Sequence, residues 1–387
     1  MQPEIPSVPN HDLPPESGNL PEPASEFAPE FKEIPHRGLR WVFIGAGGLR
    51  AGWSVVVFLV VMGLAELVVG GIFYRLHLVT KKVQFTATAE IFQELIMVLG
   101  ILAGAVVVAR IMRRSILDFN LRGPRRVPRF FGGLAAGFLA FSLLMGILAL
   151  GGWLRFGPVA LSGVAILRFG ALWGCAFLLV GCAEEGLTRC FLLSTLTRGL
   201  NFWWALGTIA VPCALVAVLG KDNGIWGVLV IALLGLGPCF WLHVKRAPGS
   251  GFWQAAWVTS TLFGLAHTGN GGENWVGIFQ AAAIGFVFCV SVRVTGSAWW
   301  AIGCHAAWDW SETYFYGATD SGLVASGHFL TTTPAGRSLW SGGEAGPEGS
   351  LLAMIVILLL LVFLVLVYGR KRAVLVTVPA ETAPAVE

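Results

Sequence analysis

Residues 52–73 read GWSVVVFLVVMGLAELVVGGIF and contain a single charged side chain, Glu66. A stretch of about 20 apolar residues is long enough to cross a bilayer as an α-helix. The whole chain has this character, because 56% of its 387 residues are apolar, 12% are charged, and the mean hydropathy is +0.73. These values exclude a soluble enzyme or a secreted disulfide scaffold as the main interpretation, and they predict an all-α, polytopic transmembrane helical bundle.

Nine further apolar runs follow at the spacing that a bilayer imposes, which predicts about ten spans in total. The seventh run is short for a span, and the ninth contains His305, Asp309 and Glu312. The predicted spans are residues 52–73, 90–112, 131–153, 168–190, 202–219, 225–243, 252–267, 275–293, 297–316 and 350–368.

The distribution of Lys and Arg predicts the orientation, because cytoplasmic loops of membrane proteins are enriched in these residues. With the N-terminus inside, 19 of the 26 Lys and Arg residues fall on the inner side. Both termini are therefore predicted to be cytoplasmic. The net charge of only +4, with basic residues gathered at the ends of apolar runs, argues against nucleic acid as a partner.

The spans divide the chain into parts of different expected roles. Residues 1–37 are rich in Pro and acidic residues, which predicts a disordered cytoplasmic tail. The other predicted parts are N-terminal transmembrane helices (38–164), a core (165–316) with an inserted helical pair (202–244), an external loop (317–349), a last transmembrane helix (350–369) and a cytoplasmic tail (370–387).

Three clusters of ionisable residues lie inside predicted spans. Ionisable side chains at this depth cost several kcal/mol unless they are paired or hydrated, so those that remain are functional candidates. The clusters are EEGLTR at 184–189, FGLAH at 263–267 and HAAWD at 305–309. The seven cysteines form no CxxC pair and have no metal-ligand spacing, and we interpret them as small buried apolar residues.

Helical spacing predicts how these side chains are oriented. Arg189 follows Glu185 by four residues and shares a helix face with it, which leaves Glu184, about 100° around the helix, to point elsewhere. His305 and Asp309 also share a face. At 1.5 Å per residue, Glu184 and His267 lie about 21 and 22 Å from the cytoplasmic ends of their helices.

His305 lies roughly 14 Å from the cytoplasmic end of its own helix. The three clusters are therefore expected at a common level in the bilayer. A carboxylate and two imidazoles that meet there could deprotonate a water molecule and stabilise an oxyanion.

The motifs EExxxR, FxxxH and HxxxN/D, in this order on separate helices, resemble those of the CPBP (CAAX protease and bacteriocin-processing) family, also called ABI. This family includes the CAAX prenyl protease 2 type and lysostaphin-resistance-protein-like bacterial members. The resemblance covers residues 165–316. It implies an intramembrane, glutamate-dependent endopeptidase without a cofactor, in a bacterial cell membrane, that cleaves a membrane-associated or prenylated peptide or protein.

The resemblance also implies roles for individual residues. Glu184 and His267 would activate a water molecule, while His305 and Asp309 would form the side that stabilises the oxyanion. The residues implied to support this site are Glu185 and Arg189, which would hold the local geometry, and Phe263, which would pack nearby.

Two features depart from the family pattern. Asp309 stands where many members have Asn, and an ionised Asp cannot donate to an oxyanion. Asp309 must then be protonated, orient His305, or indicate a divergent mechanism. The second departure is the separation of 83 residues between Glu184 and His267, since these motifs lie on consecutive helices in the family. The inserted pair at 202–244 accounts for this separation and leaves the orientation of the second motif unchanged.

Other interpretations remain open. Zinc could bind Glu184, His267 and His305, because two imidazoles and a carboxylate form a known catalytic zinc set, although the chain has no HExxH motif. A membrane binding partner, an immunity-type protein or a transporter could use the same polar cluster without catalysis. Buried Glu and Arg can also form a purely structural ion network. Three more acids at membrane depth have no assigned partner: Glu66, Glu94 and Glu312.

Overall fold

The computed structural model describes residues 40–45, 48–80, 85–219 and 225–369, so both predicted tails lie outside the described residues. The chain divides into two units, residues 1–48 and 49–387. In the first unit the structure describes a one-turn helix, α1 (Arg40–Phe43), and a two-residue strand, β1 (Ile44–Gly45). The strand β2 (Gly48–Leu49) stands at the junction of the units.

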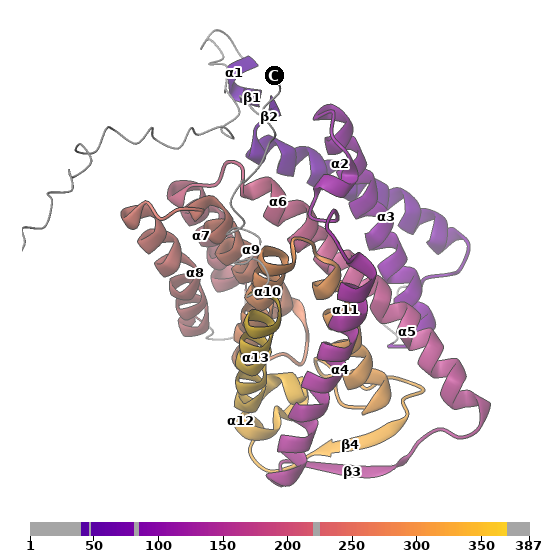
Figure 1. Cartoon of the computed structure of the whole chain (residues 1–387). Helices are drawn as coiled ribbons and strands as arrows, with labels where there is room; N and C mark the ends of the chain where they lie inside the picture. The colour runs from indigo at the N-terminus through magenta and orange to yellow at the C-terminus, as the bar shows by residue number, and fades with distance from the viewer. Residues whose placement is uncertain (1–39, 46–47, 81–84, 220–224, 370–387) are drawn as a thin grey trace, which may run out of the picture. The chain divides into compact units, whose positions relative to one another are not determined.

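The second unit is mostly helical (Figure 1). Each of the ten apolar runs predicted from the sequence is helical in the structure. The α-helices are α2 (Ala51–Arg75), α3 (Ala87–Ile111), α4 (Arg126–Leu150), α5 (Val164–Glu185), α6 (Leu193–Leu196), α7 (Phe202–Leu219), α8 (Ile225–Lys245), α9 (Ser250–Ala266), α10 (Trp275–Thr295), α11 (Trp299–Asp309), α12 (Ser338–Ser341) and α13 (Leu351–Leu364).

Among the described residues, seven helices are long and apolar enough to cross a membrane. The apolar helix α7 is shorter, and α9 and α11 fall outside this set. The helix α2 buries only Ser54 and Phe58, so most of its apolar side chains face outward, as lipid contact requires. The seven segments are Ala51–Arg75, Ala87–Ile111, Arg126–Leu150, Val164–Leu196, Ile225–Lys245, Trp275–Thr295 and Leu351–Gly369.

Close packing of α4 on α11 is made possible by glycines. A Cβ atom on Gly133 would overlap the carbonyl oxygen of Trp300, and one on Gly137 would overlap that of Cys304. Small residues four apart allow two helix backbones to approach in this way. The helix α11, which carries the third motif, is therefore held directly against α4.

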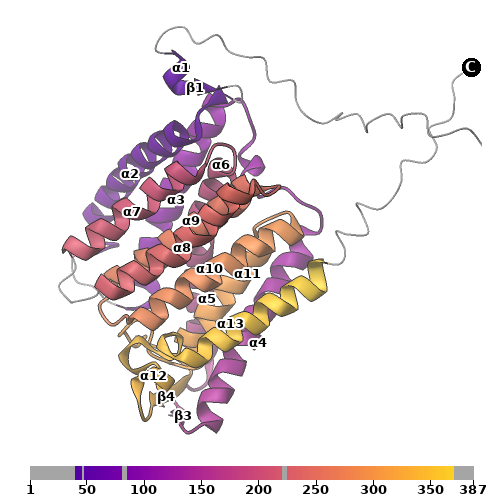
Figure 2. The ribbon, with the colours of Figure 1, turned by 90° about the vertical axis from the view of Figure 1, so that its left-hand side faces the viewer.

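Residues 202–244, predicted to be an inserted pair, lie in the helices α7 and α8, which pack together and both contact α9. Figure 2 shows α7, α8, α9 and α10 running side by side. The Phe202 ring stacks on the His243 ring with a centroid separation of 5.5 Å. After α8 the chain is back at the end of the bundle where α6 ends. The helix α9 therefore begins beside the end of α6, where a Cβ atom on Gly251 would overlap the Thr197 carbonyl oxygen.

A small sheet was not expected from the sequence. Strand β3 (Leu154–Val159) pairs antiparallel with β4 (Leu330–Pro334) and ties the segment after α11 to the connection between α4 and α5. Nearby, the rings of Trp153 and Trp340 stack at 5.6 Å. The all-α prediction describes the bundle but omits this sheet, because strands of five or six residues between longer apolar runs leave little signal.

Candidate active site

Both helices that carry carboxylates of the site change geometry there. The helix α5 ends at Glu185 and continues as a π-helical segment, Gly186–Leu192. The helix α11 ends at Asp309 and continues as a second one, Trp310–Phe315. Hydrogen bonds in π-helices run from residue i to i+5, and such segments occur frequently at functional sites. Side-chain directions after Glu185 and Asp309 therefore differ from those of a continuous α-helix.

The Glu185 carboxylate joins the first motif to the third. Its Oε1 atom accepts a hydrogen bond from Arg189 Nη1 at 3.2 Å and lies 2.9 Å from His305 Nδ1. The side chains of Glu185 and Arg189 are completely buried. Because a carboxylate only accepts, His305 Nδ1 must carry the proton in this contact. The pairing of Glu185 with Arg189 was predicted, whereas the contact with His305 was not.

The Arg189 guanidinium is enclosed by aromatic rings and a glycine. It lies over the Phe263 ring at 4.4 Å and over the Phe288 ring at 5.5 Å from the centroids. A Cβ atom on Gly285 would overlap Arg189 Nη2. Cation–π contacts of this kind stabilise a desolvated guanidinium. Phe263 therefore packs against the site, as the family resemblance implies.

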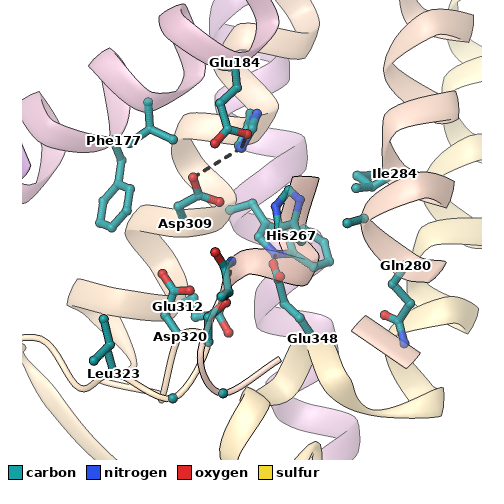
Figure 3. Close-up of a pocket in the computed structure, with 18 of the residues that line it drawn as sticks. Phe177, Glu184, His267, Gln280, Ile284, Asp309, Glu312, Asp320, Leu323 and Glu348 are labelled. Carbon is teal, nitrogen blue, oxygen red and sulfur yellow. Dashed lines mark hydrogen bonds and ion pairs between the residues drawn. The ribbon is translucent and has the colours of Figure 1, made fainter. Parts of the chain in front are cut away.

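Two further carboxyl groups face the other ring nitrogen of His305. Nε2 lies 3.4 Å from Asp309 Oδ2 and 3.7 Å from Glu184 Oε2. Figure 3 shows Glu184 and Asp309 directed into the same space. His305 is thus placed between Glu185 on one side and Glu184 and Asp309 on the other. Of the three interpretations of Asp309, this arrangement favours the one in which it orients His305.

His267 immediately follows the last residue of α9 and reaches the same space (Figure 3). Its Nδ1 atom lies 2.8 Å from the carbonyl oxygen of Phe263. A carbonyl oxygen only accepts, so Nδ1 donates and the neutral ring keeps Nε2 as an acceptor. This contact gives His267 the tautomer that a general base requires.

The four residues predicted to be catalytic line one cavity of about 720 Å³, together with Phe263. The buried Glu185 and Arg189 are not among the lining residues and lie behind the wall. The exposed lining residues of the loops form what we call the cavity mouth: Gly269, Asn270, Gly271, Gly322, Leu323 and Glu344. The mouth lies where α9 ends and α10 begins, on the same side of the bundle as the β3–β4 sheet.

The cavity is more acidic than the sequence suggested. Besides Glu184 and Asp309, six carboxyl groups line it, and no Lys or Arg is among its described lining residues. Glu94 and Glu312 had been noted as unpartnered acids at membrane depth, but nothing in the sequence placed the others in the site. The six are Glu90 and Glu94 from α3, Glu312 after α11, and Asp320, Glu344 and Glu348 from the segment between α11 and α13.

Three acids outside the membrane-spanning segments, Glu273, Asp320 and Glu348, have raised pKa values. Burial, together with the charges of Asp320 and Glu273, raises the pKa of Glu348 to about 7. Burial likewise raises the pKa of Asp320 and of Glu273. Trp308 Nε1 donates a hydrogen bond to Glu348 Oε1, and Thr313 Oγ1 donates one to Asp320 Oδ2 at 3.2 Å. Perturbed carboxyl groups of this kind gather at functional sites.

The fit of the site to a metal ion can be judged from its donors. Within the described part of the chain, no three or more His, Cys, Asp or Glu residues form a group that could hold a metal ion. Both nitrogens of His305 face carboxylates. Among the described residues, Glu184, His267 and His305 are therefore not grouped as a metal-binding set in this arrangement.

Comparison with known proteins gives a family match for one part of the chain. Residues 239–311 match the family model described as Type II CAAX prenyl endopeptidase Rce1-like. The matched residues include His267, His305 and Asp309, while Glu184 lies outside them. The match confirms the family resemblance seen in the motifs and suggests a protease. None of the curated proteins and none of the solved structures matches the chain.

Proposed function

Given that this match supports assignment of the chain to the CPBP (CAAX protease) family, we propose that the protein is an intramembrane endopeptidase whose attacking water is activated by Glu184 and His267. The observation that carries the proposal is that Glu184, His267, His305 and Asp309, from three separate helices, line one cavity. A carboxylate base, an imidazole acceptor and a second imidazole held by carboxylates are sufficient for peptide hydrolysis.

In the proposed reaction Glu184 removes a proton from water while His267 Nε2 orients it. The water oxygen bonds to the scissile carbonyl carbon, and the carbonyl oxygen becomes an oxyanion. His305, protonated on both nitrogens and held by Glu185 and Asp309, stabilises that oxyanion. Glu184 then passes its proton to the leaving nitrogen as the C–N bond breaks, which leaves a carboxylic acid and an amine and returns Glu184 to its carboxylate form.

The position of the mouth supports access from the non-cytoplasmic side. We propose ten membrane crossings with both termini in the cytoplasm of a bacterial cell. Of the described Lys and Arg residues in 49–369, excluding the buried Arg189, twelve lie at the end of the bundle opposite the mouth and four lie at the mouth end. By the preference of basic residues for the cytoplasm, the mouth then faces outward. The four are Arg75, Arg155, Arg168 and Arg337.

The proposal is tested by comparing protein termini in cells that express the wild type or the Glu184→Gln variant. At least one cleaved terminus should disappear in Glu184→Gln and in His267→Ala. The matched control is Glu66→Gln, which makes the same change at an acid of α2 that does not line the cavity. If both site variants are expressed at normal levels and leave all termini unchanged, the protein acts by binding and not by cleavage.

A further inference from the structure

The charge of the cavity is strongly unbalanced. Its described lining residues include eight carboxyl groups and two imidazoles but no Lys or Arg. Several of these acids are not needed by the proposed reaction, and three of them lie together on the mouth side of Asp309 in Figure 3. We call these three the outer acid group: Glu312, Asp320 and Glu348. Like charges held together at low dielectric repel one another, so a cation among them would be stabilised.

Glu312 is an unsatisfied member of this group. Its side chain is 2% exposed, and its Oε1 atom has no hydrogen-bond partner among the described residues. The side chain shares a hydrogen bond with Glu348 and interacts electrostatically with Glu348, Asp320 and Asp309, all of which are acids, so only its Oε1 atom is left without a partner. A buried acceptor without a donor costs free energy comparable to a lost hydrogen bond. A positively charged donor arriving from the cavity would remove that cost.

Gln280 gives independent support from another helix. This α10 residue is 3% exposed and lines the cavity. Its Nε2 donates to the carbonyl oxygen of Ser350, which can only accept, so the orientation of the amide is determined. Its Oε1 atom has no partner among the described residues. Figure 3 shows Gln280 across the cavity from Glu312 and Asp320. Two buried acceptors on opposite walls of the cavity thus each lack a donor.

We propose that the outer acid group and Gln280 form a subsite for a cationic side chain, Lys or Arg, of the peptide substrate. This inference rests on the proposed endopeptidase function and specifies its substrate class. Arg offers five N–H donors and Lys offers three, and neither accepts hydrogen bonds. The subsite lies between the mouth and Glu184, so the cationic residue would occupy it while a neighbouring peptide bond reaches Glu184 and His267.

The test uses two peptides that differ only in charge. Acetyl-Leu-Ala-Arg-Ala-Leu-amide is compared with the same peptide containing citrulline, which has nearly the same shape as Arg and no charge. Binding is measured by calorimetry on the full chain in detergent at pH 8, in the Glu184→Gln background so that nothing is cleaved. The Arg peptide should bind at least tenfold more tightly than the citrulline peptide.

Variants of the outer acid group test whether these residues cause the preference for the Arg peptide. When Glu312→Gln and Glu348→Gln are both added, the ratio of the affinity for the Arg peptide to that for the citrulline peptide should fall close to one. Glu348→Gln alone, in the short 3-10 helix Pro347–Gly349 before α13, should reduce the affinity ratio at least threefold and serves if the double variant does not fold. Adding Glu66→Gln should leave the ratio unchanged. Equal binding of the two peptides, no binding of either, or a preference retained in Glu348→Gln would each overturn the subsite.

Failure of the proposed function gives a different result. If the Arg preference is present and depends on Glu348, but wild type and Glu184→Gln leave both peptides and all cellular termini equally intact, the subsite stands and the protease assignment is lost. If wild type cleaves and the Arg preference is absent, the protease stands and the subsite is lost.

Discussion

His305 Nδ1 lies 2.9 Å from Glu185 Oε1, although 120 positions separate the two residues in the chain. The same oxygen accepts a hydrogen bond from the buried Arg189. One carboxylate therefore positions a ring from α11 and neutralises a guanidinium that follows α5. The second Glu of the first motif holds the third motif in place, which leaves the first Glu free to face the cavity.

Glu185→Gln should destabilise the protein and reduce cleavage. The variant leaves the buried Arg189 without its counter-charge, and breaking a buried pair in this way costs about 3–5 kcal/mol. Thermal unfolding in detergent measures the loss. The double variant Glu185→Gln with Arg189→Met should regain much of the stability but not the activity, because His305 Nδ1 then faces a neutral amide and no longer a carboxylate. An unchanged Tm in Glu185→Gln would contradict the role given to this pair.

Asp309→Asn tests what Asp309 does. If its carboxylate orients His305 across 3.4 Å, the neutral amide should lower kcat by about tenfold with little change in KM or Tm. The measurement is cleavage of whichever substrate the comparison of termini identifies. Full activity in Asp309→Asn would instead support a role as a neutral hydrogen-bond donor.

The free energy of unfolding should fall as the pH rises from about 5 to 8. The folded-state pKa of Glu348 is raised to about 7 from an ordinary value of 4.5, so the folded state retains a proton that the unfolded chain releases in this window. The stabilising effect is therefore greatest at low pH and is lost as pH rises through 7. The raised pKa of Asp320 acts in the same direction.

Thermal unfolding at several pH values checks this expectation. Glu348→Gln should flatten the dependence, because the amide does not titrate. The groups that act on Glu348 are Asp320, Glu273, His267 and Trp308, with Glu312 beside it. If Tm changes with pH equally in wild type and Glu348→Gln, the pH dependence of stability comes from the other titratable groups and not from Glu348.

Gly137→Ala should destabilise the contact between α4 and α11. The added methyl group would overlap the Cys304 carbonyl oxygen, one residue before His305, and overpacking of this kind costs typically about 1–3 kcal/mol. Gly146→Ala is the matched control on the same helix, where an added Cβ has no described atom within 4 Å. We expect Tm and cleavage to fall in the first variant only. Equal Tm values for the two would contradict close packing at Gly137.

Chelation separates the metal-free reaction from the zinc alternative. Because the described residues form no group of three or more His, Cys, Asp or Glu that could hold a metal ion, treatment with 1,10-phenanthroline should leave cleavage intact. The metal content of the purified protein, measured by mass spectrometry, should be well below one zinc per chain. Stoichiometric zinc together with loss of cleavage on chelation would show that the reaction uses a metal.

Much of the helical fold could be predicted, because apolar runs of bilayer length are strong signals. The ten predicted runs are helical in the structure. The strands β3 and β4 were missed because they are short and their pairing joins residues far apart in the chain. The prediction also assumed regular α-helices, because no sequence signal indicated the π-helical segments after Glu185 and Asp309.

The candidate site was predictable only where its residues lie on helices. Spacing and depth brought Glu184, His267, His305 and Asp309 to one level, and they line one cavity. The contact of Glu185 with His305 depends on how α5 and α11 are rotated against each other, which spacing within one helix does not determine. Asp320 and Glu348 lie in a segment that the sequence describes only as an external loop, so their place in the cavity required the tertiary structure.

The mouth has a practical consequence for inhibition. Its rim consists of loops beyond the helix ends, at the end of the bundle with few basic residues. In the proposed orientation, which places that end outside the cell, a compound added to the medium would meet the cavity before it met lipid or cytoplasm. A charged, water-soluble peptidomimetic would therefore need neither a transporter nor passive permeability to reach its target.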